Sequence, residues 1–151
     1  ENKPLGTGGS LKLLKDKVKS TFFVSNCDVI INDDYTKIID FHKKGQYKLT
    51  LVASIQHQII PYGVCEIEKG GNLKRIIEKP EYDFLVNTGI YIIEPEILEL
   101  IPNNTLFHIT DLMQKLKQQN IKMGVFPISE KSWIDIGQWE EYRKALKALE
   151  P

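Results

Sequence analysis

The chain has 151 residues, of which 42% are hydrophobic and 26% are charged, and its 20 Lys and Arg residues balance its 20 Asp and Glu residues. This length and apolar content suffice for one domain with a hydrophobic core. The zero net charge argues against a general affinity for nucleic acid or anionic membranes. No run of about 18 apolar residues is present, which argues against a membrane span.

The first part of the chain alternates between helical and strand patterns. Residues 21–25 form a short, continuous apolar run, typical of a strand buried on both faces. Asp33-Asp34 offers an N-cap for a helix over 35–44, which Gly45 ends. Residues 49–56 have the pattern of a second strand. An earlier helix is predicted from apolar residues spaced for one face, namely Leu11, Leu13, Leu14 and Val18.

The middle of the chain has a hairpin pattern, and alternation then resumes. The glycine-bearing turn at 69–72 separates strand patterns over 63–68 and 73–78. Later elements are predicted in the order strand, helix, helix, strand, helix, over 84–93, 95–100, 110 onward, 122–127 and 138–149. This order predicts an α/β fold with a mainly parallel, mixed sheet and an antiparallel excursion. In such sheets ligands bind beyond the carboxyl ends of the strands.

Two aspartates stand where extended segments end. Asp28 closes Ser25-Asn26-Cys27-Asp28 after the first strand, and Asp135 lies in Trp133-Ile134-Asp135-Ile136-Gly137, with Trp133 expected beside a pocket or in the core. Each aspartate alone is equally well explained as a strand-ending or helix-capping residue. Two carboxylates brought together from distant parts of the chain can instead hold a hard divalent cation.

Four further segments combine polar and glycine residues in ways that suit a sugar phosphate or a nucleotide. They are Pro4-Leu5-Gly6-Thr7-Gly8-Gly9, Pro61-Tyr62-Gly63-Val64, Ile77-Glu78-Lys79-Pro80 and Val86-Asn87-Thr88-Gly89. A carboxylate accepts hydrogen bonds from sugar hydroxyls, an ammonium pairs with phosphate, and a glycine lets a ligand approach the backbone. Taken singly, each segment is also explained as an ordinary turn, loop, bulge or strand end.

In this order, the segments resemble the sugar-1-phosphate nucleotidyltransferases. The resemblance implies a Rossmann-like nucleotide-diphospho-sugar transferase fold and transfer of a nucleotidyl group from an NTP to a sugar 1-phosphate, which releases pyrophosphate. Asp28 and Asp135 would hold the Mg²⁺ cofactor, and Lys79 would bind the sugar phosphate. Glu78, Gly63, Asn87 and Gly89 would contact the sugar, and Gly6 would contact the base.

The segments from 107 to 137 look most like bacterial enzymes that transfer guanylyl groups to hexose or hexosamine 1-phosphates, which favours GTP modestly over other nucleotides. The family's Gly-x-Gly-x-Arg loop, which a Lys-Pro segment follows in family members, is not found in the sequence. We therefore expect residues 1–151 to be a partial catalytic domain, incomplete at the N-terminus and weak or inactive alone. A missing central strand would expose apolar surface, through which copies could self-associate. The alternative is a non-catalytic nucleotide-sugar-binding or regulatory module.

The cysteines and histidines show no spacing typical of a metal site or a disulfide framework. Cys27 and Cys65 lie in apolar runs, which predicts buried, reduced thiols and a cytoplasmic location. His42, His57 and His108 are predicted to be surface or partly buried residues.

Overall fold

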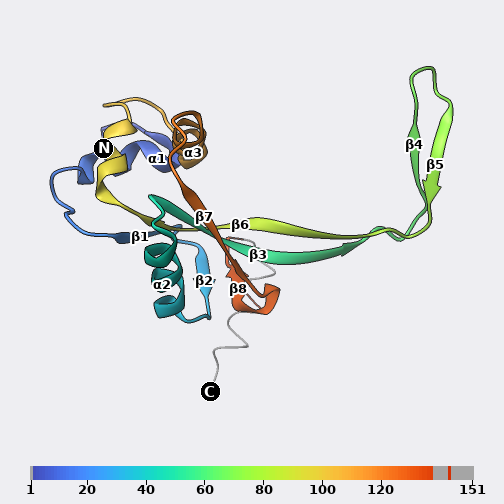
Figure 1. The fold of residues 1–151 in the computed structure, drawn as a ribbon, viewed down its shortest axis with the longest axis horizontal. Helices are drawn as coiled ribbons and strands as arrows, with labels where there is room; N and C mark the ends of the chain where they lie inside the picture. Colours follow the sequence, from blue (N-terminus) through green and yellow to red (C-terminus); the bar gives the residue numbers. More distant parts are fainter. Residues whose placement is uncertain (1, 138–142, 144–151) are drawn as a thin grey trace.

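The protein is described by a computed structural model that covers residues 2–137 and residue 143. Apart from position 143, the helix predicted over 138–149 lies outside the described residues. A four-stranded sheet, in the order β1-β6-β3-β7, forms the centre of the molecule (Figure 1). Its strands are β1 (Phe22–Ser25), β3 (Leu49–Ile59), β6 (Glu81–Ile93) and β7 (Met123–Ile128).

The sheet is mixed, as the sequence predicts. β6 is antiparallel to both β1 and β3, and β3 is parallel to β7. Three of the four strands therefore run in one direction and β6 runs against them. The α/β prediction is confirmed.

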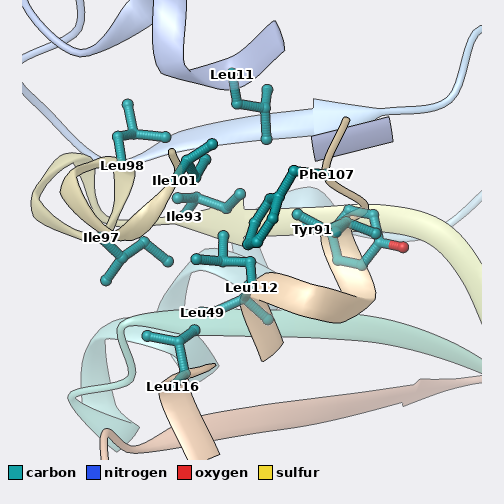
Figure 2. Packing of buried hydrophobic residues seen from close by; sticks show 11 residues of the cluster. Leu11, Leu49, Tyr91, Ile93, Ile97, Leu98, Ile101, Phe107, Leu112 and Leu116 are labelled. Atoms are coloured by element: carbon teal, nitrogen blue, oxygen red, sulfur yellow. The ribbon is translucent and has the colours of Figure 1, made fainter. Parts of the chain in front are cut away.

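Two apolar clusters cover opposite faces of the sheet. Because successive residues of a strand point to opposite faces, Tyr91 and Ile93 join one cluster while Ile90 and Ile92 join the other. Figure 2 shows the first cluster, where Leu112 of α3 packs against the sheet at zero exposure. The helical elements are α1 (Gly6–Gly9), η1 (Ser10–Leu14), α2 (Tyr35–Gly45), η2 (Pro95–Leu100), α3 (Ile109–Gln118) and η3 (Glu130–Ser132).

Local side-chain hydrogen bonds fix the N-terminal starts of the two longer helices. Asp34 caps α2, since its side chain accepts a hydrogen bond from the backbone N–H of Thr36 at 2.9 Å. At the start of α3, Asp111 accepts from the backbone N–H of His108 at 2.7 Å. Both helices begin within one residue of the predicted position.

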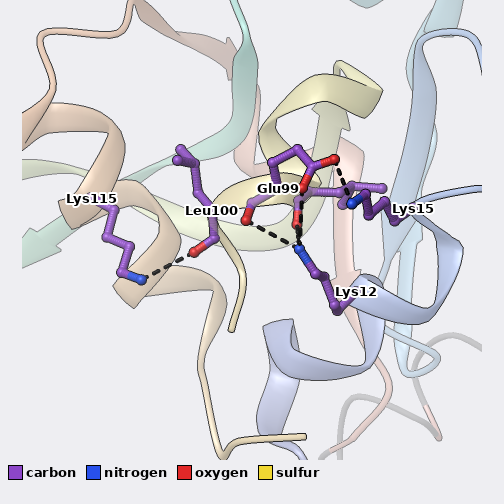
Figure 3. A network of polar contacts seen from close by, with 6 residues as sticks. Lys12, Lys15, Glu99, Leu100 and Lys115 are labelled. Atoms are coloured by element: carbon purple, nitrogen blue, oxygen red, sulfur yellow. Dashed lines mark hydrogen bonds and ion pairs between the residues drawn. The ribbon is translucent and has the colours of Figure 1, made fainter. Parts of the chain in front are cut away.

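The predicted first helix is wrong in extent. Only a short helical segment forms, it ends before Val18, and Leu13 is 55% exposed. The backbone N–H groups of Gly8 and Gly9 both donate to the carbonyl of Phe107, so tertiary contacts fix this segment. Lys12 of η1 and the following Lys15 pair with Glu99 of η2, and Lys115 of α3 donates to the carbonyl of Leu100 (Figure 3).

β3 and β6 are longer than predicted and continue beyond the sheet as a two-stranded ribbon (Figure 1). The ribbon leads to a hairpin of β4 (Val64–Ile67) and β5 (Leu73–Ile77). We call residues 55–86 the arm and the remaining described residues the body. Many large apolar side chains of the arm are exposed, namely Ile55, Ile59, Tyr62, Ile67, Leu73, Ile76, Tyr82, Phe84, Leu85 and Val86.

The structure corrects three predictions of burial. His42 is 1% exposed, and its ring contacts Thr50 Oγ1 at 2.7 Å and Glu94 Oε1 at 3.2 Å, so it is a core residue. Cys27 and Cys65 are unpaired but exposed. Cys27 lies in the loop after β1, and Cys65 lies on the arm, where none of the described residues forms a second layer over the strand. Within the described residues, no helix combines the length and apolar character needed to cross a membrane.

Candidate active site

The two aspartates meet because two short strands pair. β2 (Val29–Ile31) and β8 (Trp133–Asp135) are antiparallel, with Val29 opposite Asp135. The backbone N–H of Ile136 then donates to the carbonyl of Asp28 at 2.8 Å. This ladder places the ends of two segments more than a hundred residues apart in sequence side by side.

Gly137 shows how closely the two carboxylates approach. A Cβ placed on Gly137 would lie 2.9 Å from Asp28 Oδ2 and 3.1 Å from Asp135 Oδ1. Both oxygens are thus within 3.1 Å of one point, and any larger residue there would push against both. The backbone N–H of Gly137 also donates to Asp135 Oδ1 at 3.0 Å, which orients that carboxylate.

A bulge in β6 forms the opposite wall. Between the pairs Leu51–Tyr91 and Ala53–Asn87, one residue of β3 faces three residues of β6. Gly89 adopts φ +81° within the bulge. Asn87 stabilises the turn, because Oδ1 accepts from the Gly89 N–H at 2.9 Å and Nδ2 donates to the Tyr91 hydroxyl at 2.8 Å.

A polar pocket of about 170 Å³ lies between these parts. Four of the predicted site residues line it, together with the indole of Trp133, whose Nε1 is buried and has no hydrogen-bond partner among the described residues. Burial raises the pKa of the Tyr91 hydroxyl at the pocket wall, so this group stays neutral at physiological pH. The lining is Asn26, Asp28, Val29, Asn87, Thr88, Gly89, Tyr91, Trp133 and Asp135.

The carboxylate oxygens fit a magnesium ion whose remaining coordination positions are filled by substrate and water. Among residues 2–137 and 143, no group of three or more His, Cys, Asp or Glu side chains could hold a metal. Mg²⁺ is usually bound by one or two carboxylates plus substrate phosphates and water, so an all-protein cage is unnecessary. The converging oxygens of Asp28 and Asp135 supply those two carboxylates.

The arm carries three other predicted site residues, and none of them lines the pocket. A Cβ on Gly63 would lie 3.0 Å from Glu78 Oε2, so these two residues are neighbours where the hairpin joins the ribbon. Lys79 follows with φ +45°, a left-handed backbone conformation. Figure 1 shows the hairpin projecting away from β2 and β8. The structure thus divides the predicted site into a carboxylate pocket and an arm portion.

Gly6 is also apart from the pocket. A Cβ on Gly6 would lie 2.8 Å from the carbonyl oxygen of Phe107, and its φ of +76° favours glycine. Next to it, the hydroxyl of Thr7 accepts from the backbone N–H of Ile109 at 3.2 Å, at the start of α3. Packing against the start of α3 therefore accounts for this glycine without a ligand.

Sequence reasoning assigned no role to Asn26 or Gly137, although both stand inside the motifs that it selected. Asn26 is two residues before Asp28, and Gly137 is two residues after Asp135. The available signal was the spacing: a residue two positions from a strand-end ligand can reach the same pocket.

Comparisons with known proteins show which family the chain resembles. A family model described as nucleotidyl transferase matches residues 1–151. The mannose-1-phosphate guanyltransferase of Saccharomyces cerevisiae is 34% identical, over 94% of this chain and 41% of its own length. The mannose-1-phosphate guanylyltransferase catalytic subunit beta of Drosophila pseudoobscura is 31% identical, over 94% of this chain and 39% of its own.

Solved structures show the same fold. HddC from Yersinia pseudotuberculosis superposes with a TM-score of 0.70 and 28% identity, over 99% of this chain and 65% of that one. The same protein complexed with GMP-PN gives a TM-score of 0.68. The chain spans about two fifths of the length of the curated relatives above. The family match over residues 1–151 establishes that the chain belongs to the sugar-1-phosphate nucleotidyltransferase family.

Proposed function

We propose that the protein containing this chain transfers a nucleotidyl group from an NTP to a sugar 1-phosphate, with Mg²⁺ as cofactor. A phosphate oxygen of the sugar phosphate forms a bond to the α-phosphorus of the NTP. The bond from that phosphorus to the bridging oxygen breaks, and pyrophosphate leaves with the electron pair. The observation that carries the proposal is the pairing of β2 with β8, which brings Asp28 and Asp135 into one polar pocket.

The chain's residues supply mainly positioning and charge. The sugar phosphate is already ionised at neutral pH, so the pocket needs no strong base. When bound, Mg²⁺ offsets the repulsion between the two phosphate-bearing substrates and the charge that develops in the transition state. Asp28 and Asp135 would hold this ion, and Asn87 and Gly89 would form the adjoining wall against the sugar.

Guanylyl transfer to a hexose 1-phosphate is the specific reaction that we propose. Two relatives are named as mannose-1-phosphate guanylyl transferases, and HddC has been crystallised with GMP-PN. Mannose 1-phosphate with GTP is therefore the first substrate pair to test. We also propose a cytoplasmic location, which the unpaired Cys27 and Cys65 support.

A non-catalytic nucleotide-sugar-binding module is the second candidate. It is favoured by the separation of Lys79 and Glu78 on the arm from the carboxylate pocket. A chain in this arrangement could bind a nucleotide sugar at the pocket without bringing an ammonium group to the reacting phosphate. For the same reason, we propose that the 151-residue chain alone turns over slowly or not at all.

The test measures pyrophosphate release from GTP and mannose 1-phosphate with Mg²⁺, in the protein that contains this chain and in its Asp28→Asn and Asp135→Asn variants. Each variant should lose at least about 100-fold in turnover, since changes beyond the direct ligands already cost 10–100-fold. Asp16→Asn, at an exposed residue, serves as the matched control. Near-normal turnover in either pocket variant would refute the metal assignment. Binding of GDP-mannose without any pyrophosphate release would favour the binding module.

A further inference from the structure

Asn26 occupies the pocket beside the two aspartates. It extends the pairing of β1 with β6, because its backbone N–H donates to the carbonyl of Gly89 at 3.0 Å. Its carboxamide then lies directly over the Cα of Gly89. A Cβ on Gly89 would be 2.6 Å from Asn26 Nδ2 and 2.8 Å from its Cγ.

The two asparagines of the pocket differ in how their carboxamides are used. Both carboxamide atoms of Asn87 have a partner in the protein, the Gly89 N–H and the Tyr91 hydroxyl. The side chain of Asn26 is exposed and makes no hydrogen bond within the described residues. Asn87 therefore holds the bulge in shape, whereas the carboxamide of Asn26 is available to a ligand.

The pocket needs a donor of this kind. The ionised carboxylates of Asp28 and Asp135 can only accept hydrogen bonds, and they repel a phosphate group. The hydroxyl of Thr88 already donates to the carbonyl of Val52 at 2.8 Å. Trp133 Nε1 is buried and is not exposed to the solvent that fills the open pocket. The two N–H groups of Asn26 Nδ2 are thus accessible, neutral donors beside the carboxylates.

We propose that Asn26 is a substrate-binding residue whose Nδ2 donates a hydrogen bond to a phosphate oxygen of the bound sugar phosphate or nucleotide sugar. Gly89 serves this role as a positioning residue, because the lack of a side chain leaves room for the carboxamide. The inference rests on the proposed function, since it requires that the pocket receives a phosphate-bearing sugar. It adds a donor to phosphate beside the wall that Asn87 and Gly89 form against the sugar.

Calorimetric titration of the protein that contains this chain with GDP-mannose, in the presence of Mg²⁺, tests this inference. Asn26→Leu keeps most of the side-chain bulk over Gly89 but removes both donors, and Asn26→Ala removes the bulk as well. Both variants should weaken GDP-mannose binding by roughly 10- to 100-fold, the usual cost of a hydrogen bond to a charged group. Asn103→Ala, at an exposed asparagine outside the pocket, should bind as the unaltered chain does.

A second measurement separates a ligand contact from a structural role. Mn²⁺ binding, followed by electron paramagnetic resonance without nucleotide, should be unchanged in both Asn26 variants and lost in Asp28→Asn. Unaltered GDP-mannose affinity in both Asn26 variants would overturn the inference while leaving the proposed function intact. Parallel loss of Mn²⁺ and GDP-mannose binding would overturn it in favour of a structural role. If the unaltered protein that contains this chain binds neither probe, the proposed function fails and the inference fails with it.

Discussion

The body and the arm share the same two strands, β3 and β6, and differ in what covers them. In the body, Ile90 and Ile92 of β6 are 2% and 0% exposed because α2 packs over them. In the arm, Ile55 of β3 faces Leu85 of β6, and these side chains are 45% and 58% exposed. Strands of equal apolar character are therefore buried only where a helix layer lies over the sheet.

The candidate site lies at the boundary between these regions. The bulge at Asn87–Gly89 ends the arm, and the carboxylates of Asp28 and Asp135 belong to the body. The buried sheet beneath can fix the carboxylates rigidly. Glu78 and Lys79 depend instead on a two-stranded ribbon, which is marginally stable in water unless something covers it.

The largest expected effect is a difference in stability between truncating a buried leucine of the body and truncating an exposed leucine of the arm. Leu112→Ala removes a fully buried side chain from the body and should lower the free energy of unfolding by about 2–5 kcal/mol. Leu85→Ala makes the same chemical change on the arm, where the side chain is already largely in water, and should change it by less than about 0.5 kcal/mol. Urea denaturation followed by circular dichroism measures both. Equal losses would show that the arm is packed as tightly as the body.

The body was predictable from the sequence, whereas the division of the site was not. Apolar runs and caps such as Asp34 depend on local chemistry, so the strands and the longer helices were located closely. The proximity of Asp28 and Asp135 was implied by the resemblance to the family, and the pairing of β2 with β8 is its physical basis. Local patterns carry no information on whether a layer covers a strand. For that reason the length of the arm, its exposure and the placement of Glu78 and Lys79 outside the pocket were missed.

A buried network of hydrogen bonds in the body should give the next largest effect on stability. His42 links Thr50 and Glu94, and Glu94 also accepts from the Thr21 hydroxyl at 2.7 Å. His42→Ala leaves the buried Thr50 hydroxyl without this partner, which should cost about 1–3 kcal/mol of unfolding free energy. His57→Ala, on the exposed arm, is the matched control and should leave stability nearly unchanged. An unaffected midpoint in His42→Ala would show that water replaces the ring at no cost.

Exposed apolar side chains on the arm should be detectable without any change of fold. Tyr82 and Phe84 stack with ring centroids 6.0 Å apart, and Phe84 is 51% exposed. We expect the chain to bind a hydrophobic fluorescent dye and to self-associate at high concentration. Phe84→Ser combined with Leu85→Ser should reduce both signals. Light scattering measures self-association, and dye fluorescence measures the exposed apolar surface. If the unsubstituted chain is monomeric and does not increase the dye fluorescence, the arm is covered.

The smallest expected effect concerns the charged pair on the arm. The hydrogen bond from His57 to Asp83, at 2.9 Å, raises the pKa of the His57 imidazole above its usual 6.5, and Glu81 adds to this. Because the folded pKa is the higher one, the pair stabilises the ribbon below about pH 6.5, and this contribution is lost as pH rises through the folded pKa. A proton NMR titration of His57 should show the raised value, and Asp83→Asn should bring it down. Because the pair is exposed, Asp83→Asn should hardly change the free energy of unfolding of the whole chain, whereas the pKa of His57 should fall. An ordinary pKa in the unaltered chain would mean that β3 and β6 are not paired at this point, and that the arm frays where the body stays ordered.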